Sequence, residues 1–356
     1  MNRNLSVYLD LLRLIAAVGV FLGHGRRLLM PTLPVVIGGN ASQCVAIFFV
    51  LSGFVIAFVT DQKERDWQSY ARARVLRMYS VTIVAFAVTL IADRIGFSAH
   101  PEVYAQLDGF QLHPDAAALI SYFGFVNQIW WNNSWIGSNQ AYWSLGYEVP
   151  YYAIFGVFLF SPARWRWLAT TLVCLAIGPR VIAYLPLWLF GVWTFKYVQQ
   201  LQQRSGSQRD QRLGLMLLAG SLFAYLLFRF VPRIPINNIY QFDSLGSFAI
   251  SMVHFHVVGV FVVINIIGFV LFSNGRELWG RSIEQRIRWL AGGSFTLYLV
   301  HEPLMIAFSA LVPTVKTAAI LGIGGLAAVA TIAYLVAELG ERRKRLLNRL
   351  FPARAI

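Results

Sequence analysis

Long runs of hydrophobic residues separated by short polar connectors dominate this chain of 356 residues. A helix needs about 20 apolar residues to cross the roughly 30 Å of hydrocarbon in a bilayer, whereas the strands of a transmembrane barrel alternate in polarity over about ten residues. The runs are continuous, so they predict an all-α fold, a polytopic transmembrane helix bundle with about ten spanning helices. We place these spans at residues 8–29, 41–60, 76–95, 147–161, 167–183, 184–199, 212–231, 244–272, 289–312 and 317–338.

A further apolar stretch, residues 116–131, is short and rich in aromatic residues. Tryptophan side chains favour the boundary between lipid and water. We therefore expect a short interfacial or re-entrant helix here, with Trp130, Trp131 and Trp135 close to the membrane surface. The alternative is an ordinary eleventh span.

The composition is that of a single membrane-embedded domain over residues 1–356. Hydrophobic residues make up 57% of the chain and charged residues only 13%, whereas a soluble domain is about a quarter charged. The two cysteines, Cys44 and Cys174, form neither a disulfide framework nor a metal-binding pattern. Asp10 and Arg13 interrupt the first run, which argues against a cleavable signal peptide.

Most of the excess positive charge lies between the hydrophobic runs. The net charge is +14, and Lys and Arg concentrate in the cytoplasmic loops of membrane proteins. The excess of positive charge therefore indicates the membrane topology, with the lipid bilayer as partner. We expect no nucleic-acid partner. On this rule both termini are cytoplasmic, residues 96–146 form an extracytoplasmic segment, and residues 339–356 form a basic cytoplasmic tail. The orientation rests on Lys63, Arg65, Arg72, Arg74, Arg77, Arg164, Arg166, Arg204, Arg209, Arg212, Arg276, Arg281, Arg286, Arg288, Arg342, Arg343, Lys344 and Arg345.

The first span carries three ionisable residues, Asp10, Arg13 and His24. Such groups are costly inside a membrane and are candidates for function. Arg13 and His24 are eleven residues apart, so they lie on one helix face about 16 Å apart along the axis, and Asp10 lies one turn before Arg13 and can pair with it. We expect this face to line a cavity that runs from near the cytoplasm to the outer half of the membrane. Alternatively, Asp10 and Arg13 form a structural pair, and His24 sits in the headgroups.

Two other motifs place polar groups at span ends. Arg74 and Arg77, one turn apart, form a fork suited to phosphate, unless they only anchor the span on its positive side. The run Trp143-Ser144-Leu145-Gly146-Tyr147-Glu148 brings a carboxylate to the outer end of the fourth span. A Glu at this position also complements the helix dipole.

In the ninth span, Ser294, Tyr298 and His301 fall at helical spacing and share a polar stripe, and Glu302 and Pro303 follow. Such a stripe lines a cavity or joins neighbouring helices by hydrogen bonds.

Taken in order, these motifs resemble the acyltransferase-3 family of integral membrane acyltransferases, which acylate cell-envelope glycans and other extracytoplasmic acceptors. The resemblance covers nearly the whole chain, and Glu302 departs from it because this position is often aromatic. The motifs are Leu9-Asp10-Leu11-Leu12-Arg13 with His24 eleven residues after Arg13, Phe48-Phe49-Val50-Leu51-Ser52-Gly53-Phe54, Arg74-x-x-Arg77, Trp143-Ser144-Leu145-x-x-Glu148 and Tyr298-Leu299-x-His301-x-Pro303.

The resemblance implies transfer of an acyl group, expected to be acetyl, from cytoplasmic acyl-CoA to a hydroxyl of an extracytoplasmic glycan or lipid-linked saccharide. It implies an O-acetyltransferase in a bacterial inner (cytoplasmic) membrane, with acetyl-CoA as co-substrate and no metal.

Within this resemblance each polar residue has an expected role. His24 would be the catalytic group, as general base or as acyl carrier. Arg13, paired with Asp10, would stabilise negative charge, and Arg74 and Arg77 would bind the CoA phosphates. Glu148 completes the catalytic set, and the residues expected to contact the acceptor are Trp143, Tyr298 and His301.

The alternative function is a transporter or flippase for a glycan or lipid-linked substrate. Such proteins often show inverted repeats or spans broken by Gly and Pro in matching halves. The sequence shows no repeat of this kind, although Pro179 and Pro186 interrupt one region.

Overall fold

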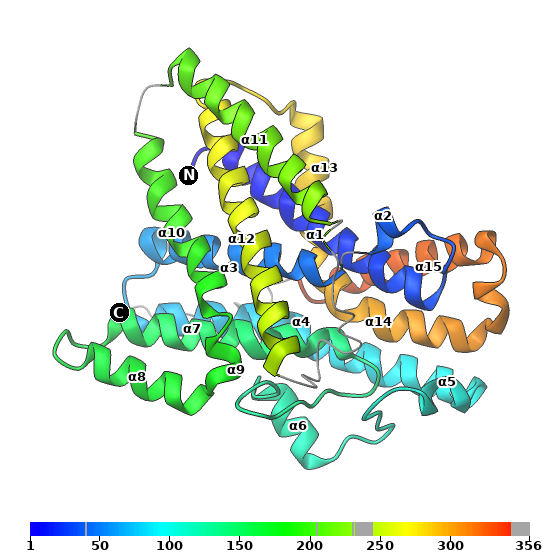
Figure 1. Ribbon diagram of the computed structural model, residues 1–356. Helices are drawn as coiled ribbons and strands as arrows, with labels where there is room; N and C mark the ends of the chain where they lie inside the picture. The colour runs from blue at the N-terminus through cyan, green and yellow to red at the C-terminus, as the bar shows by residue number, and fades with distance from the viewer. Residues whose placement is uncertain (40, 204–205, 230, 232–244, 343–356) are drawn as a thin grey trace.

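A computed structural model describes residues 1–39, 41–203, 206–229, 231 and 245–342, and all regular structure within these ranges is helical (Figure 1). The predicted all-α fold is confirmed. Arg204, residue 244 at the start of the eighth predicted span, and residues 343–356 of the predicted basic tail lie outside the described residues.

Each of the ten predicted spans corresponds to a helix. Eight are long and apolar enough to cross a membrane, and two shorter helices, α7 (Leu145–Phe160) and α8 (Arg166–Ile177), make about ten spans. The eight are built on α1 (Arg3–Leu28), α3 (Ala41–Lys63), α4 (Trp67–Ala99), α10 (Leu185–Leu201) with the preceding turn α9 (Pro179–Ile182), α11 (Gln208–Phe228), α12 (Leu245–Ser273), α14 (Ser294–Leu311) and α15 (Ala319–Ala337).

Helix α8 ends earlier than the sequence predicts. The fifth span was expected to continue to residue 183, but the helix stops at Ile177. Gly178 has a φ of +92° and Pro179 follows it, and both residues end a helix. A Cβ at Gly178 would lie 2.9 Å from the ring of Trp130, so this turn needs glycine.

The apolar stretch 116–131 is helical only in its first half. Helix α6 (Ala116–Phe123) has eight residues, about 12 Å of helix, which is too short to span a bilayer. Turns follow, and Phe125 and Trp130 have positive φ angles of 55° and 53°. The remaining short elements are α2 (Val35–Gly38), α5 (Pro101–Ala105), η1 (Gln140–Ser144) and η2 (Pro313–Lys316).

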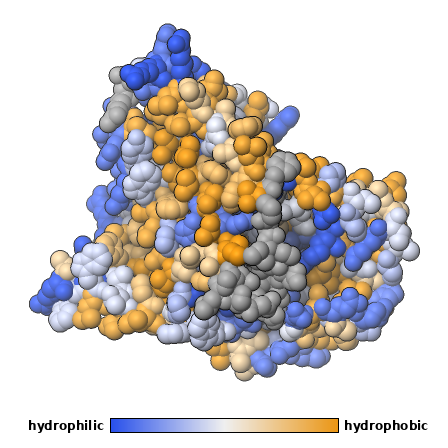
Figure 2. Space-filling view, viewed as in Figure 1, coloured by the Kyte–Doolittle hydropathy of each residue, from blue (hydrophilic) through white to orange (hydrophobic). Residues whose placement is uncertain are grey.

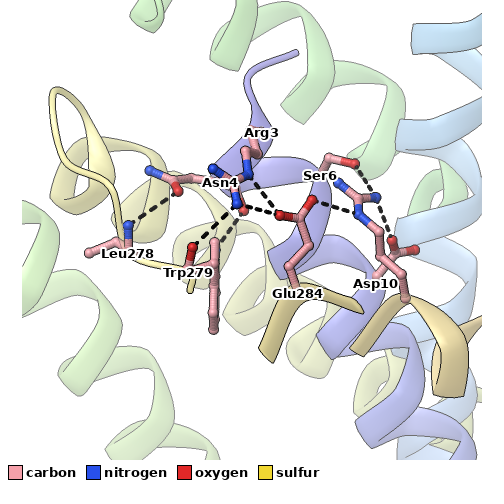
Figure 3. A network of polar contacts seen from close by, with 8 residues as sticks. Arg3, Asn4, Ser6, Asp10, Leu278, Trp279 and Glu284 are labelled. Carbon is pink, nitrogen blue, oxygen red and sulfur yellow. Dashed lines mark hydrogen bonds and ion pairs between the residues drawn. The ribbon is translucent and has the colours of Figure 1, made fainter. Parts of the chain in front are cut away.

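Helix α13 (Arg281–Ala291) is a separate amphipathic helix before α14, which corrects the predicted start of the ninth span at residue 289. Gly292 and Gly293 separate the two helices. Figure 3 shows how α13 is fixed to the start of α1: Glu284 accepts a hydrogen bond of 2.7 Å from Arg3, and Arg288, one turn after Glu284 on α13, donates to Ser6 at 3.1 Å.

Helices that are distant in sequence pack as pairs (Figure 1): α11 lies along α12, α4 along α14, and α10 contacts α3. The α3–α10 contact depends on two glycines. A Cβ at Gly53 would lie 2.0 Å from the carbonyl oxygen of Trp188, and a Cβ at Gly191 would lie 2.0 Å from that of Val50. Figure 2 shows a broad hydrophobic surface over α11 and α12, where side chains such as Met216 are exposed, as expected of a lipid-facing surface.

The helix ends that carry the basic connectors contact one another. The start of α1 lies against α13, the end of α12 against the start of α11, the end of α10 against the end of α3, and the residues after α15 against the start of α14. The contacts are Arg3 with Glu284, Arg276 with Gln211, Gln199 with Asp61, and Glu341 with Thr296. These ends form what we call the basic end of the bundle.

Candidate functional site

A cavity at the basic end, here called the inner cavity, lies among α1, α3, α4, α7 and α14. Charged and hydroxyl side chains from seven segments line it, together with apolar residues that come mostly from α3. Its polar lining consists of Asp10, Arg13, Ser52, Arg77, Ser144, Glu148, Ser294, Tyr298 and Glu341.

Asp10 and Arg13 pair at 2.8 Å, as their spacing predicts. The second oxygen of Asp10 lies 3.1 Å from Arg288 of α13, so the network of Figure 3 reaches the cavity wall. The Nε atom of Arg13 is buried and has no hydrogen-bond partner among the described residues. A buried donor without a partner is costly, so Arg13 is suited to an oxygen atom of a bound substrate.

Glu148 lines the inner cavity together with Arg13 and Arg77, which corrects its predicted place at the outer end of the fourth span. It is held there by a chain of hydrogen bonds from three helices. Its Oε1 accepts one of 2.7 Å from Ser52 and another from the hydroxyl of Tyr152. Trp188 of α10 in turn donates to the Ser52 hydroxyl at 3.2 Å. The Ser52-Gly53 pair therefore has two roles, since Ser52 orients Glu148 and Gly53 lets α10 approach.

Arg74 and Arg77 do not form the fork that their spacing suggests. The Arg74 side chain is 8% exposed, is bound by both oxygens of Glu64, and lies over the ring of Tyr70 at 4.2 Å. Arg77 lines the inner cavity instead. Arg74 is thus held in a buried ion pair, and only Arg77 faces the cavity.

His24 lies outside the inner cavity, contrary to the expectation of one continuous cavity past Arg13. Two aromatic rings that line the cavity lie on the side of the histidine: Phe48 contacts Tyr298 edge to face at 5.4 Å, and Tyr298 lies 6.2 Å from the ring of His301, which contacts His24. These rings come from α3 and α14, so the pattern of α1 alone could not predict them.

His24 instead forms a cluster with His301 and Glu302. The Nε2 atom of His301 lies 3.0 Å from Nδ1 of His24, and Nδ1 of His301 lies 3.0 Å from the carbonyl oxygen of Leu297. A carbonyl oxygen only accepts, so His301 carries its proton on Nδ1. In neutral His301, Nε2 is then an acceptor and His24 donates from Nδ1, which leaves the lone pair of His24 on Nε2.

Glu302 joins this cluster, although no role was predicted for it. The carboxylate is fully buried, lies 3.6 Å from Nδ1 of His24, pairs with Arg27 at 2.6 Å, and accepts a hydrogen bond of 2.8 Å from the backbone of Ala141. The sequence signal that could have identified Glu302 is its position as a carboxylate in the interior of a membrane helix, where ionisable residues are candidates for function. Its position can stabilise positive charge on His24.

The segment before α7 is tied down beside this cluster. Asn139 donates to the carbonyl oxygen of Leu299 at 2.9 Å, and Ser138 donates to Asp93 of α4 from both its backbone (2.8 Å) and its hydroxyl (2.5 Å). These bonds hold Ala141 where its N–H reaches Glu302.

Trp143 and Tyr298, both expected to contact the acceptor, lie in different places. Trp143 is 8% exposed and packs against Phe49 and Tyr147, and it is not among the residues lining the inner cavity. Tyr298 lines the inner cavity and donates to Ser144 at 2.9 Å. Tyr298 therefore connects the inner cavity with the histidine cluster, whereas Trp143 belongs to the core.

The chain matches the family model Acyl_transf_3, described as an acyltransferase domain, over residues 6–338. No curated protein and no solved structure matches the chain. Because the family match runs from the start of α1 to the end of α15, and eight helices are long and apolar enough to cross a bilayer, the chain belongs to the acyltransferase-3 family and is an integral membrane acyltransferase.

Proposed function

We propose that the protein transfers an acyl group, expected to be acetyl, from cytoplasmic acyl-CoA to a hydroxyl of an extracytoplasmic glycan or lipid-linked saccharide. The basic end is then the cytoplasmic end, on the rule that Lys and Arg concentrate there. The proposed setting is a bacterial inner membrane with both termini cytoplasmic. The acyl acceptor reaches the histidine cluster from the opposite side.

The donor binds at the inner cavity in this proposal. Arg77 and Arg13 offer cationic groups at the cavity wall, and CoA is rich in phosphate, which guanidinium groups bind well. The unpartnered Nε of Arg13 is available to an acyl or phosphate oxygen. Arg74 takes no part in donor binding because its guanidinium group is held in an ion pair with Glu64.

In this proposal the Phe48–Tyr298 contact is the barrier between the inner cavity and His24, because both rings line the cavity and Tyr298 lies beside His301. The thioester must pass this contact to meet the acceptor. The 16 Å between Arg13 and His24 along α1 is then covered by the extended pantetheine arm of CoA. The proposal therefore requires Phe48 and Tyr298 to move apart when the donor binds.

His24 acts as the base through Nε2. It removes the proton of the acceptor hydroxyl, whose oxygen attacks the thioester carbonyl. The C–S bond breaks, CoA leaves as the thiolate, and the imidazolium returns the proton to sulfur. While His24 is protonated, Glu302 at 3.6 Å stabilises the positive charge. The alternative, in which His24 itself carries the acyl group, uses the same nitrogen.

The observation that carries this proposal is the His24–His301 hydrogen bond, because it leaves Nε2 of His24 unprotonated. The test supplies purified protein with radiolabelled acetyl-CoA and a panel of envelope glycans and lipid-linked saccharides. Label on one acceptor, with matching release of CoA, supports the proposal and identifies the acceptor class. Absence of both label transfer and CoA release across the panel would contradict it.

A further inference from the structure

A groove separate from the inner cavity lies between the α7–α8 hairpin and the helices α3 and α10. Its walls are mostly apolar, with Phe155, Trp167, Leu185 and Phe195 among the lining residues. Among the residues that the structure describes, none lines both this groove and the inner cavity. The site described above leaves this groove without a role.

One end of the groove is polar and carries two opposite charges. Asp61 and Lys196 line this end together with Gln199, which donates to Asp61 at 3.3 Å. Lys196 is one helical turn from Gln199, so the ammonium and the carboxylate line the same end of the groove. Both side chains are exposed, and neither belongs to an ion pair formed among the described residues.

The length of the groove corresponds to one membrane leaflet. Leu185 and Lys196 are eleven residues apart on α10, which is about 16 Å of helix and roughly half of the 30 Å hydrocarbon core. Lys196 is also close to the end of α10 that joins the basic end. A lysine there packs its alkyl stem on apolar surface and holds its ammonium at the interface.

We propose that this groove binds one molecule of phosphatidylethanolamine from the leaflet at the basic end. One acyl chain lies along the apolar walls, the phosphate pairs with Lys196, and the primary ammonium donates to Asp61. The two charges explain the choice of headgroup. Asp61 disfavours an anionic headgroup such as phosphatidylglycerol, and the quaternary ammonium of phosphatidylcholine has no N–H to donate.

The lipid would contact a residue that supports the candidate site. Trp188 lines the groove and donates to Ser52, which holds Glu148. Trp188 is fully buried in the groove wall, so an acyl chain in the groove would cover the wall that holds it and would stabilise the position of Glu148 from outside the inner cavity.

The experiment measures lipid binding directly and does not depend on the acyl acceptor. Purified, delipidated protein is titrated in detergent with dioleoyl phosphatidylethanolamine, phosphatidylglycerol or phosphatidylcholine, and native mass spectrometry counts bound lipid. We expect one phosphatidylethanolamine per chain, bound in preference to the other two. Lys196→Gln should weaken it about fivefold, and Lys316→Gln, which changes an exposed lysine away from the groove, should not.

Two further variants separate headgroup from tail recognition. Asp61→Asn should remove the preference for phosphatidylethanolamine over phosphatidylglycerol, and Thr170→Phe, which fills the groove, should weaken all three lipids. Equal binding of the three lipids by the unmodified protein would overturn the proposal, as would equal affinities for Lys196→Gln and Lys316→Gln. Displacement of phosphatidylethanolamine by an equimolar polyprenyl phosphate would reassign the groove to that lipid.

Discussion

His24 and His301 share a hydrogen bond of 3.0 Å between Nδ1 of the first ring and Nε2 of the second. The bond joins α1 to α14 and fixes which nitrogen of His24 is free to accept a proton. The carbonyl oxygen of Leu297 fixes the proton of His301 on Nδ1. Two successive hydrogen bonds, between Leu297 and His301 and between His301 and His24, therefore set the tautomer of His24. The basicity of the site thus depends on how two helices pack.

Replacing Glu302 should slow acyl transfer without unfolding the protein. Glu302→Gln keeps the shape but removes the charge that faces His24 at 3.6 Å, so we expect kcat to fall at least about tenfold, or 1.4 kcal/mol of transition-state stabilisation. The KM for acyl-CoA should stay the same, because the donor binds elsewhere. Glu338→Gln, which changes an exposed carboxylate paired with Arg342, is the control, and an unchanged kcat in Glu302→Gln would contradict the role given to Glu302.

The two arginines of the Arg74-x-x-Arg77 motif should behave differently. Arg74→Ala leaves the buried Glu64 without its partner, which costs about 3–5 kcal/mol, so we expect a large loss of thermal stability in detergent. Arg77→Ala should leave thermal stability nearly unchanged and raise the KM for acyl-CoA. Steady-state kinetics and melting curves on both variants test this, and the reverse pattern would favour the fork suggested by the spacing.

Adding a single methyl group at the contact between α3 and α10 should destabilise the protein. In Gly53→Ala the new Cβ would meet the carbonyl oxygen of Trp188 at 2.0 Å, and overpacking of this kind costs about 1–3 kcal/mol. Gly324→Ala in α15, where the new Cβ would have no atom of the described residues within 4 Å, should be neutral or stabilising because alanine favours helix more than glycine. Melting temperatures of the two variants compare these effects directly, and equal values would rule out the close contact.

The contact between α13 and α1 should weaken in acid. Hydrogen bonds from Arg3 and Arg288 hold the pKa of Glu284 below its ordinary value of 4.5. A lowered pKa in the folded state means that the stabilisation is complete above pH 4.5 and is lost as the pH falls through the lower folded value. The difference in melting temperature between the unmodified protein and Glu284→Gln should therefore shrink below pH 4.5, whereas Glu102→Gln, at an exposed residue of α5, should show no such trend.

The helices were predictable because each needs only its own residues to be apolar over a sufficient length. The misplaced boundaries have local causes: Gly178 and Pro179 end α8 early, and Gly292-Gly293 separates α13 from α14. The pairing of Asp10 with Arg13 was also predictable, since both residues lie on one face of one helix.

The site was less predictable because its contacts join distant segments. The inner cavity is lined by Arg13, Phe48 and Tyr298 but not by His24, and neither aromatic residue is on α1. Glu64, in the connection between α3 and α4, forms a buried ion pair with Arg74. Glu302 gained its role from Arg27 and the Ala141 backbone, which only the folded chain brings together.

Transfer of label across a membrane tests the central claim most directly. Proteoliposomes containing the acceptor receive radiolabelled acetyl-CoA on the side of the basic end, and labelled acceptor inside the vesicles is counted for the unmodified protein and for His24→Ala. We predict label inside only with the unmodified protein, with a loss of at least about 100-fold in His24→Ala and equal amounts of folded protein in both. Full transfer by His24→Ala, or transfer only when donor and acceptor share one side, would contradict the account.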